Sequence, residues 1–566
     1  MKQLIECVPN FSEGRDMTII KQITDQVESV EGVKLLDVDP GRATNRTVVT
    51  FVGEPEAVLE AAFLAVKRAS EVIDMRTHKG EHPRFGATDV CPLIPIRDIS
   101  MEEVAALARK LAERIGGELG IPVYCYENAA FTEERRNLAN CRAGEYEGLP
   151  DKLRDPHWKP DFGPAAFNDK VATTGVTAVG ARDFLVAYNV NLNTTSTRRA
   201  NAIAFDIREK GRPMREGNPI TGKKKLDERG KEIWIPGSLK ACKAIGWFIE
   251  EYGIAQISIN LTNISITPAH IAFEEASLKA QERGVRVTGS ELVGLIPLKA
   301  LIDAGKYFLA RQQRSSGISE KELVKIAVKS LGLDDLKPFN PKEKIIEYLL
   351  EDPDDKKLIR MTVEDFTDET ASESPAPGGG SVSAAVGALG VALGTMVANL
   401  SSHKAGWDDR WEEFSLWAEK GQKIKEELLF LVDEDTRAFN RIMDAFGLPR
   451  SSDEEKKARK KAIEVASKYA IQVPYRVMER SLESLEVMKA MAETGLEASV
   501  SDVGVGALCA RTAVMGAYLN VKINAAGLDD KEFATEMVSK GEVLEEQAIR
   551  KESEILSIVE KKIKKG

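Results

Sequence analysis

The change of pattern near residue 362 constrains the fold of this 566-residue chain more than any other feature. Before it, short apolar runs alternate with amphipathic helical segments; after it, strand patterns stop and only helical periodicity remains. Alternating strands and helices predict an α/β layer, whereas helices alone predict a bundle. A chain of this length also exceeds what one hydrophobic core supports, so several domains are expected.

The first half of the chain predicts two α/β subdomains. In the first, helices are expected at 15–30, 54–73 and 101–119, and strands at "QLIECVPNF", "VKLLDVDP", "RTVVTFVG", "VCPLIPI" and "IPVYCYE". The two strands around "DPGRATN" suit a hairpin-like connection, which favours a split βαβ unit over a doubly wound sheet. After a turn-rich stretch, a second set has strands at "DFLVAYNVNLN" and "AQISINLTN" and helices at 196–210 and 268–283.

The second half predicts an all-α bundle. Its helices are expected at 363–371, 380–402, 408–446, 453–491, 496–526 and 530–564. Residues 374–403 carry no Lys, Arg, Asp or Glu, and they are long enough to cross about 30 Å of hydrocarbon. They are mostly Gly, Ala and Ser without an aromatic belt, which favours a buried bundle helix over a membrane span. The predicted fold class is therefore multidomain: two α/β subdomains of split βαβ, ferredoxin-like type, then a helical bundle.

Composition narrows the cellular setting and the partners. A net charge of −10 argues against nucleic acid, because a phosphate backbone selects a basic surface. Six scattered cysteines without CxxC spacing are typical of a reducing interior. The N-terminal "MKQLIECVPNF" has no long apolar run of a secretory signal. A cytoplasmic protein without nucleic-acid or membrane partners is expected.

The loop "RTHKGEHPRFGATD" (76–89) holds His78 and His82, two of the chain's five histidines. A zinc pair at this spacing needs a helix, and Gly80 between them with Pro83 after them makes a helix improbable. No Cys or HExxH pattern supplies further ligands, so no metal is predicted. A histidine that titrates near neutrality can take and give a proton. The residues alone leave a catalytic histidine and a charged surface loop as alternatives.

Other charged segments of this half also leave two interpretations open. Asn10 lies in "CVPNFSEGR", and Asp39, Arg42 and Arg46 lie in "LDVDPGRATNR", but each segment alone is a common turn. The basic residues 208–231 are either a solvated hairpin or insertion, or a surface that binds an anionic ligand tail.

In the helical half, "PAPGGGSVSAA" places a Gly-rich turn at a helix start, where backbone N–H groups can receive an anion or a planar polar ring. It is not a Walker A motif, because no Gly-Lys-Ser/Thr follows. Asp433 and Asp435 lie on the next predicted long helix, where acidic residues usually face water. Asp502 interrupts a small, apolar stretch, and a buried acid there would have a raised pKa suited to a general acid or base.

These motifs, in this order, resemble the formimidoyltransferase-cyclodeaminase family, folate enzymes of histidine breakdown. The segments that carry the resemblance are "CVPNFSEGR", "LDVDPGRATNRTVVTFVG", "DMRTHKGEHPRFGATDVCPLIPI", "PDFGPAAF", "GARDFLVAYNVNL", "ELVGLIPLKAL", "FNPKEKIIEYLL", "SPAPGGGSVSAA", "LVDEDTRAFNRIMDAFGLP" and "GAYLNVKIN". They cover nearly the whole chain.

The resemblance implies a transferase made of subdomains 1–178 and 179–326, a linker over 327–362 and a cyclodeaminase bundle over 363–566. It implies transfer of a formimidoyl group from N-formimidoyl-L-glutamate to N5 of tetrahydrofolate. The bundle would then close 5-formimidoyltetrahydrofolate to 5,10-methenyltetrahydrofolate with loss of ammonia. Tetrahydrofolate, in polyglutamylated form, is thus the expected co-substrate, and self-association into dimers or larger rings is expected.

By the same resemblance, the catalytic residues are His82 in the transferase and Asp435 in the bundle, and His78 is left as a neighbour or structural residue. The arginines of the first half suit a dicarboxylate substrate. The residues expected to bind substrate or folate are Asn10, Asp39, Arg42, Arg46, Arg84, the family's folate stretch Gly163, Pro164, Ala165, Ala166, Phe167, Asn168, Asp169, Lys170, Val171 and Ala172, and, in the helical half, Gly378, Gly379, Gly380, Ser381 and Asp502.

Three alternatives remain open at this level. The bundle can act as a methenyltetrahydrofolate cyclohydrolase, as small relatives of it do, or the donor can be formimidoylglycine. A non-catalytic folate-binding scaffold is the third, although such a protein would be expected to lack His82 or Asp435, and both are present.

Overall fold

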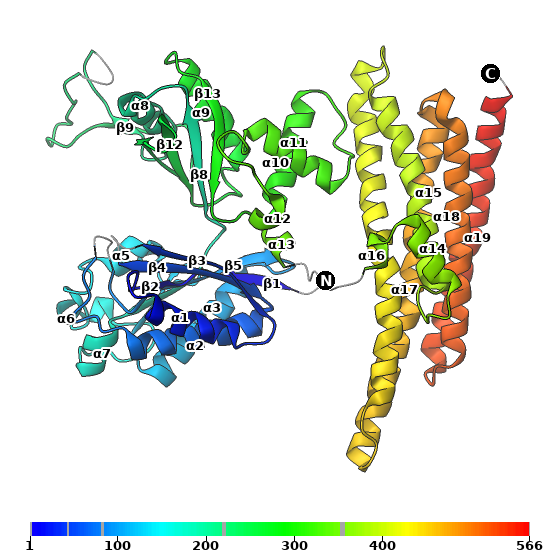
Figure 1. Cartoon of the computed structure of the whole chain (residues 1–566), viewed down its shortest axis with the longest axis horizontal. Helices are drawn as coiled ribbons and strands as arrows, with labels where there is room; N and C mark the ends of the chain where they lie inside the picture. Colours follow the sequence, from blue (N-terminus) through cyan, green and yellow to red (C-terminus); the bar gives the residue numbers. More distant parts are fainter. Residues whose placement is uncertain (1–2, 42–44, 81–83, 218–221, 351–356, 565–566) are drawn as a thin grey trace. The chain divides into compact units, whose positions relative to one another are not determined.

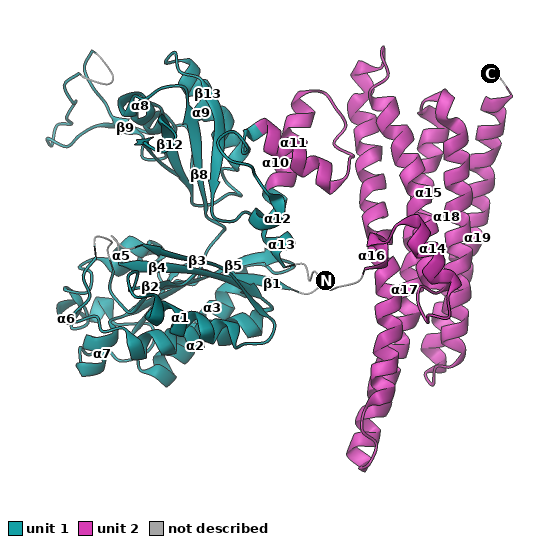
Figure 2. Cartoon of the chain, viewed as in Figure 1, with its two compact units in different colours: residues 1–300, 331–350 teal, residues 301–330, 351–566 magenta. Residues whose placement is uncertain are grey.

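The computed structural model of the chain describes residues 3–41, 45–80, 84–217, 222–350 and 357–564 (Figure 1). The chain divides into two compact units (Figure 2). One comprises residues 1–300 and 331–350 and contains the two large sheets and a small two-stranded one. The other comprises residues 301–330 and 351–566. It is helical, as the end of the strand patterns near residue 362 predicts.

The first sheet is a ferredoxin-like core with two added strands. Its elements are β1 (Leu4–Cys7), β2 (Asn10–Phe11), α1 (Met17–Glu28), β3 (Val33–Gly41), β4 (Arg46–Gly53), α2 (Pro55–Val72), β5 (Thr88–Arg97), α3 (Met101–Leu119), β6 (Val123–Glu127) and β7 (Thr177–Ala181). β1 and β2 act as one interrupted strand, antiparallel to both β4 and β5, and β3 pairs with β4 as the predicted hairpin. β7 and then β6 extend the sheet in parallel from β5.

Apolar side chains of this sheet face α1, α2 and α3, and they form one core with the buried sides of those helices. α3 is well defined at its start, because Ser100 and Glu103 form a reciprocal capping box. Short helices lie over the other face, around the buried Phe85, Tyr124 and Tyr126. These are α4 (Glu133–Arg136), α5 (Leu138–Arg142) and α6 (Leu149–Lys152), whereas α7 (Asp169–Thr174) contacts α2.

The second sheet has the ferredoxin-like order without additions. Its elements are β8 (Val186–Leu192), α8 (Thr197–Ile207), β11 (Cys242–Ile249), β12 (Ile254–Leu261), α9 (Ala269–Gln281) and β13 (Val287–Val293). The spatial order β11–β12–β8–β13 is antiparallel throughout, which is the split βαβ topology predicted. The basic segment forms a hairpin-like excursion, in which β9 (Arg212–Pro213) pairs with β10 (Trp234–Ile235).

The helical unit is built on α15 (Gly379–Ser402), α16 (Trp411–Gly447), α17 (Asp453–Thr494), α18 (Val500–Ala526) and α19 (Lys531–Ile563), preceded by α14 (Val363–Ala371). Within the described residues, α15 is the helix long and apolar enough to cross a membrane. Most of it is instead buried in the bundle core, as predicted. Its small residues allow close packing: a Cβ on Gly390 would lie 2.9 Å from the Gly506 carbonyl oxygen.

The segment that follows the second sheet is helical. It contains α10 (Leu298–Arg311), α11 (Glu320–Leu331), α12 (Pro341–Lys344) and α13 (Ile346–Leu349). Residues 301–330 pack with the bundle: Ser316 donates a 2.6 Å hydrogen bond to Glu419 of α16, and Lys306 pairs with the same carboxylate at 2.8 Å.

Candidate active sites

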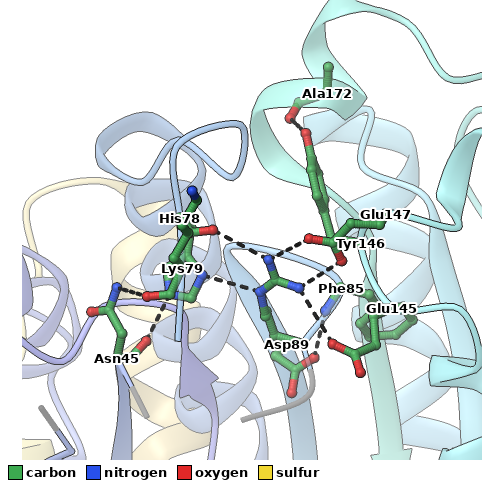
Figure 3. A network of polar contacts seen from close by, with 10 residues as sticks. Asn45, His78, Lys79, Phe85, Asp89, Glu145, Tyr146, Glu147 and Ala172 are labelled. Atoms are coloured by element: carbon green, nitrogen blue, oxygen red, sulfur yellow. Dashed lines mark hydrogen bonds and ion pairs between the residues drawn. The ribbon is translucent and has the colours of Figure 1, made fainter. Parts of the chain in front are cut away.

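The histidine loop of the first unit is held by a polar network around Arg84 (Figure 3). His82 and Arg42 lie outside the described residues. Arg84 Nε donates to His78 Nδ1 at 3.3 Å, so Nε2 carries the proton and donates to the Asn45 carbonyl at 2.8 Å. Burial lowers the pKa of His78, and the charge of Arg84 acts in the same direction. His78 is therefore held neutral in one tautomer, which fits a structural neighbour of the predicted catalytic residue.

Arg84 itself is buried and already has a carboxylate partner. Its two terminal nitrogens donate to the two oxygens of Glu147 at 2.9 and 2.8 Å, and Glu145 lies 3.5 Å away. Glu147 is largely exposed, with 66% of its side chain open to solvent. The guanidinium predicted to receive a substrate carboxylate is thus occupied by a protein carboxylate that could exchange with it.

The predicted folate stretch lies beside this network. Residues 163–168 form a mostly exposed loop, and the Asn168 side chain caps α7 by accepting from the Val171 N–H at 2.9 Å. Tyr146 joins the two regions: its hydroxyl donates to the Ala172 carbonyl at 2.5 Å, and its N–H donates to the Arg84 carbonyl at 3.0 Å (Figure 3). The Phe167 ring lies 6.4 Å from the Tyr146 ring.

Strand-end residues complete the same side of the first sheet. Arg46 donates to the Asn10 side-chain oxygen and lies 3.9 Å from Asp89, which is fully buried. Asp89 also accepts from Arg142 at 2.7 Å. Asp39 is exposed on β3. It lies opposite Val48 of β4, and Val48 lies opposite Asn10 of β2, so Asp39 and Asn10 share one face of the sheet. The structure thus groups Asn10 and Arg46, with Asp39 at the sheet edge.

Sequence reasoning missed three residues that organise this region, namely Asn45, Tyr146 and Glu147. Asn45 has a left-handed φ of 48°, and its side chain also accepts from the Gly14 N–H and donates to the Lys79 carbonyl. Asparagine tolerates this left-handed conformation better than most residues, and this preference is the one local signal that the sequence offered. Tyr146 and Glu147 come from a distant loop and carry no such signal.

In the helical unit, Asp435 of α16 meets the first turn of α15. Its Oδ2 accepts from the Ser381 N–H at 2.8 Å and from the Ser381 hydroxyl at 3.1 Å. A Cβ on Gly380 would lie 2.2 Å from Asp435 Oδ1, so glycine is needed for this approach. Burial raises the pKa of Asp435, and the two Ser381 hydrogen bonds partly offset the rise. A carboxyl whose pKa is raised is better suited to deliver a proton than an ordinary aspartate.

The Gly-rich turn lies next to Asp435, as the sequence suggests. Gly378 is the N-cap residue of α15 and has open space where a side chain would be. A Cβ on Gly379 would lie 3.1 Å from the Asn520 side-chain nitrogen. Asn520 belongs to α18 and was not predicted as a site residue. The first turn of α15 therefore adjoins both Asp435 of α16 and Asn520 of α18.

Other acids predicted in this half have different surroundings. Asp433 and its neighbour Glu434 are buried rather than facing water: Asp433 accepts from the Leu358 N–H at 2.7 Å, and Glu434 accepts from the Tyr469 hydroxyl at 2.5 Å. Asp502 is not brought to the Asp435 site. It lies in the first turn of α18, eighteen residues from Asn520, which is about 27 Å along a helix.

A metal site is not formed by the described residues: none of their His, Cys, Asp and Glu side chains gather in a group of three or more.

Three family models match consecutive parts of the chain. The N-terminal subdomain of the formiminotransferase domain matches residues 4–182, the formiminotransferase domain matches 187–351, and formiminotransferase-cyclodeaminase matches 362–542.

Curated relatives match the whole chain and each half. Formimidoyltransferase-cyclodeaminase of Gallus gallus is 42% identical over 563 residues, covering 99% of this chain and all of the relative. Glutamate formimidoyltransferase of Streptococcus pyogenes is 44% identical over 55% of this chain and 94% of its own. Methenyltetrahydrofolate cyclohydrolase of Methylorubrum extorquens is 37% identical over 36% of this chain and 97% of its own. By its end-to-end match to such relatives, the chain belongs to the formimidoyltransferase-cyclodeaminase family.

Proposed function

We propose that the chain is a bifunctional folate enzyme. Its first unit transfers the formimidoyl group of N-formimidoyl-L-glutamate to N5 of tetrahydrofolate. Its helical unit converts the product to 5,10-methenyltetrahydrofolate and ammonia. The observation that carries the proposal is the pairing of a family match over the full chain with a half-buried Asp435 of raised pKa at the start of a Gly-rich helix.

In the transfer, N5 attacks the formimidoyl carbon, the new N5–C bond forms, and the bond to the glutamate nitrogen breaks. N5 must lose a proton and the glutamate nitrogen must gain one, so a single residue that titrates near neutrality can serve both steps. We assign this role to His82. The neutral His78 and the buried Arg84 beside it would orient the loop, and Arg84 would bind a substrate carboxylate after release of Glu147.

In the ring closure, N10 attacks the same carbon, and its proton passes to the imine nitrogen. The resulting amine needs one further proton before the C–N bond breaks and ammonia leaves. Asp435, whose pKa is raised by burial, can supply it in the carboxylic acid form. The ligand's ring would lie against the first turn of α15, and no metal is assigned a role.

A turnover assay tests the proposal directly. The full chain with formimidoylglutamate and tetrahydrofolate should produce methenyl absorbance and ammonia. His82→Ala should abolish transfer and leave closure of added 5-formimidoyltetrahydrofolate intact, and Asp435→Asn should do the reverse. Loss of both activities in a folded single variant would contradict separate sites.

Two enzymatic alternatives are separated by the same assay. A cyclohydrolase would hydrolyse the methenyl compound without releasing ammonia from the formimidoyl one; the Methylorubrum relative carries that name over this half. A different donor would show as turnover with formimidoylglycine in preference to formimidoylglutamate. A non-catalytic scaffold would bind tetrahydrofolate and show neither activity.

Self-association is part of the proposal. Large apolar side chains of α15 and α18 remain exposed in the helical unit, and such patches mark protein contacts. They include Leu389, Leu519 and Ile523, with 67%, 63% and 70% of their surface open. Light scattering should find a dimer or larger assembly in the cytoplasmic protein, and Leu519→Asp with Ile523→Asp should reduce its mass. An unchanged mass would exclude this surface.

A polyglutamylated folate is the proposed physiological co-substrate, and the basic residues 208–231 are one proposed contact for its acidic tail. Lys224 of this segment pairs with Glu232 at 2.5 Å. If neutralising Lys223, Lys224 and Lys225 leaves the affinity for polyglutamylated folate unchanged in the transfer step, this contact is excluded.

A further inference from the structure

One face of α16 changes from buried to exposed at Asp435. Before this residue, Ile424, Leu428 and Val432 lie within about 60° of it around the helix, and all three are buried. α15 covers this part of the face, because a Cβ on Gly387 of α15 would lie 3.4 Å from Leu428. Asp435 contacts the first turn of α15, so it is the position at which this cover ends.

After Asp435, the same face of α16 carries large apolar side chains that remain exposed. Phe439, Met443 and Phe446 follow Asp435 by four, eight and eleven positions, which places them within about 80° of it around the helix. Their exposed fractions are 41%, 53% and 50%. These three residues, called the open stripe below, begin one helical turn, or about 6 Å, beyond Asp435.

The two sides of Asp435 along this face differ in chemistry. On one side, the N–H groups of the first turn of α15, the Ser381 hydroxyl and the Asn520 amide form or offer hydrogen bonds. On the other side, the open stripe presents two aromatic rings and a thioether, which offer apolar contact and only weak hydrogen bonding. A ligand that lies across Asp435 therefore fits best if one end is polar and the other is an apolar ring.

The substrate of the proposed ring closure has these two ends. Its reacting carbon is attached to N5 of the pterin, which is rich in hydrogen-bonding groups, and is attacked by N10. N10 is bonded directly to a benzene ring, whose atoms lie roughly 1.5–4.5 Å from it by ordinary bond lengths. With N10 at the reacting carbon beside Asp435, this ring reaches the beginning of the open stripe.

From this arrangement, we infer that the open stripe binds the aminobenzoyl ring of the folate while the pterin lies at the first turn of α15. The inference rests on the proposed cyclodeaminase activity and adds to it the residues that hold the ring. Phe439 contributes most, because it is the stripe residue nearest to Asp435 and aromatic rings pack favourably on one another. The stripe has no titrating group, so it acts on substrate binding and leaves proton transfer to Asp435.

Phe439→Ala in the full chain tests the inference, with Leu416→Ala as the matched control. Leu416 is an apolar residue of the same helix with 63% of its surface exposed, but it lies about 28 Å along the helix from Asp435. Phe439→Ala should raise KM for 5-formimidoyltetrahydrofolate about tenfold in the ammonia-release assay and leave kcat unchanged. Leu416→Ala should change neither value. An unchanged KM in Phe439→Ala, or a loss confined to kcat, would overturn the inference.

Two fragments of the substrate decide which ring the open stripe binds. p-Aminobenzoylglutamate carries the benzene ring, and 6-methyltetrahydropterin carries the reduced pterin. Inhibition of ring closure by p-aminobenzoylglutamate should weaken about tenfold in Phe439→Ala, whereas inhibition by 6-methyltetrahydropterin should stay the same. The opposite pattern, or no difference between the variant and the unsubstituted chain, would overturn the assignment of the ring.

A second copy of the chain is the competing occupant of the open stripe. Met443 distinguishes the two, because peroxide oxidises exposed thioethers and Met17 of the first unit is a reference of similar exposure, 57% against 53%. Without ligand, both residues should be oxidised at similar rates, and p-aminobenzoylglutamate should slow the oxidation of Met443 alone. If Met443 is protected without ligand and Phe439→Ala lowers the mass measured by light scattering, the stripe is a contact between copies and the inference is wrong.

The oxidation assay also separates failure of the inference from failure of the proposed function. If the unsubstituted chain releases no ammonia from 5-formimidoyltetrahydrofolate, the proposed function is wrong. Protection of Met443 by p-aminobenzoylglutamate that is lost in Phe439→Ala would still support the stripe as a ring-binding surface. Absence of that protection would reject it.

Discussion

Replacing Gly380 by alanine should separate the two activities without unfolding the protein. The added Cβ would lie 2.2 Å from Oδ1 and 2.6 Å from Oδ2 of Asp435, distances that real Cβ atoms do not reach. Either the carboxylate or the helix start must shift. The carboxylate is the movable partner, and its shift breaks the 2.8 Å hydrogen bond from the Ser381 N–H.

The size of the effect follows from this geometry. The carboxylate has to retreat by about 1 Å, and a displacement of that size at a reacting group can cost about 100-fold in rate. The general acid itself contributes about 10²- to 10⁴-fold, which sets the upper limit. Stability should change little, because alanine gains up to about 1 kcal/mol over glycine within a helix and offsets part of the strain.

Ammonia release and methenyl absorbance measure ring closure, and consumption of formimidoylglutamate measures transfer. Gly380→Ala should lose closure about 100-fold and keep transfer. Gly447→Ala is the matched control, because a Cβ there meets nothing within 4 Å. Full closure activity in Gly380→Ala would refute the assigned role of Asp435. An equal loss of both activities, with a lowered unfolding temperature, would show a structural effect instead.

Three further predictions concern charge. Glu147→Ala should lower KM for formimidoylglutamate severalfold in the transfer assay, because it frees the Arg84 guanidinium; an unchanged or higher KM contradicts the exchange. Burial raises the pKa of Asp435, so ionisation of this carboxyl destabilises the folded state above the ordinary pKa of an aspartate. Asp435→Asn should therefore raise the unfolding temperature at pH 7, and by less as the pH approaches 4. An equal gain at the two pH values would contradict this prediction. Burial also raises the pKa of Glu6 from 4.5 to about 7, so stability of the first unit should fall as pH rises between these values. Glu6→Gln should therefore gain about 3 kcal/mol at pH 8 and none near pH 4, measured by denaturant unfolding across pH, and a gain that does not grow with pH would contradict this.

Strong periodicity made most of the fold predictable. α2, α3 and the long bundle helices lie close to their predicted positions, because each carries an apolar stripe or, in α15 and α18, a long run of small apolar residues. β7, β11 and β13 were not predicted. β7 is a short Ala- and Gly-containing run, and Gly289 and Ser290 interrupt β13, so each has a weak strand pattern. β11 alternates buried and exposed residues in the structure, but exposed Ile245 and Trp247 hide that alternation in the sequence.

The candidate sites were predictable only where one segment carries the chemistry. The Gly-rich turn predicted that a polar group approaches the helix start closely. In the structure, the Asp435 carboxylate is the group that lies there. The same helix pattern suggested that Asp433 and Asp435 face water. Asp433 is buried and Asp435 is half-buried, and their partners, residues 358 and 381, come from other parts of the chain. Partners of this kind leave no trace in local spacing.

The two candidate sites are each assembled within one compact unit. The Arg84 network lies in the first unit, and Asp435 and Ser381 lie in the second. The 5-formimidoyl intermediate is therefore made by residues of one unit and consumed by residues of the other. Its pterin end is the part that reacts in both steps, whereas its glutamate end is chemically the same before and after both reactions. Substitutions at Asp435 should therefore change ring closure and leave transfer intact, and a folded Asp435 variant that lost both activities would contradict this separation.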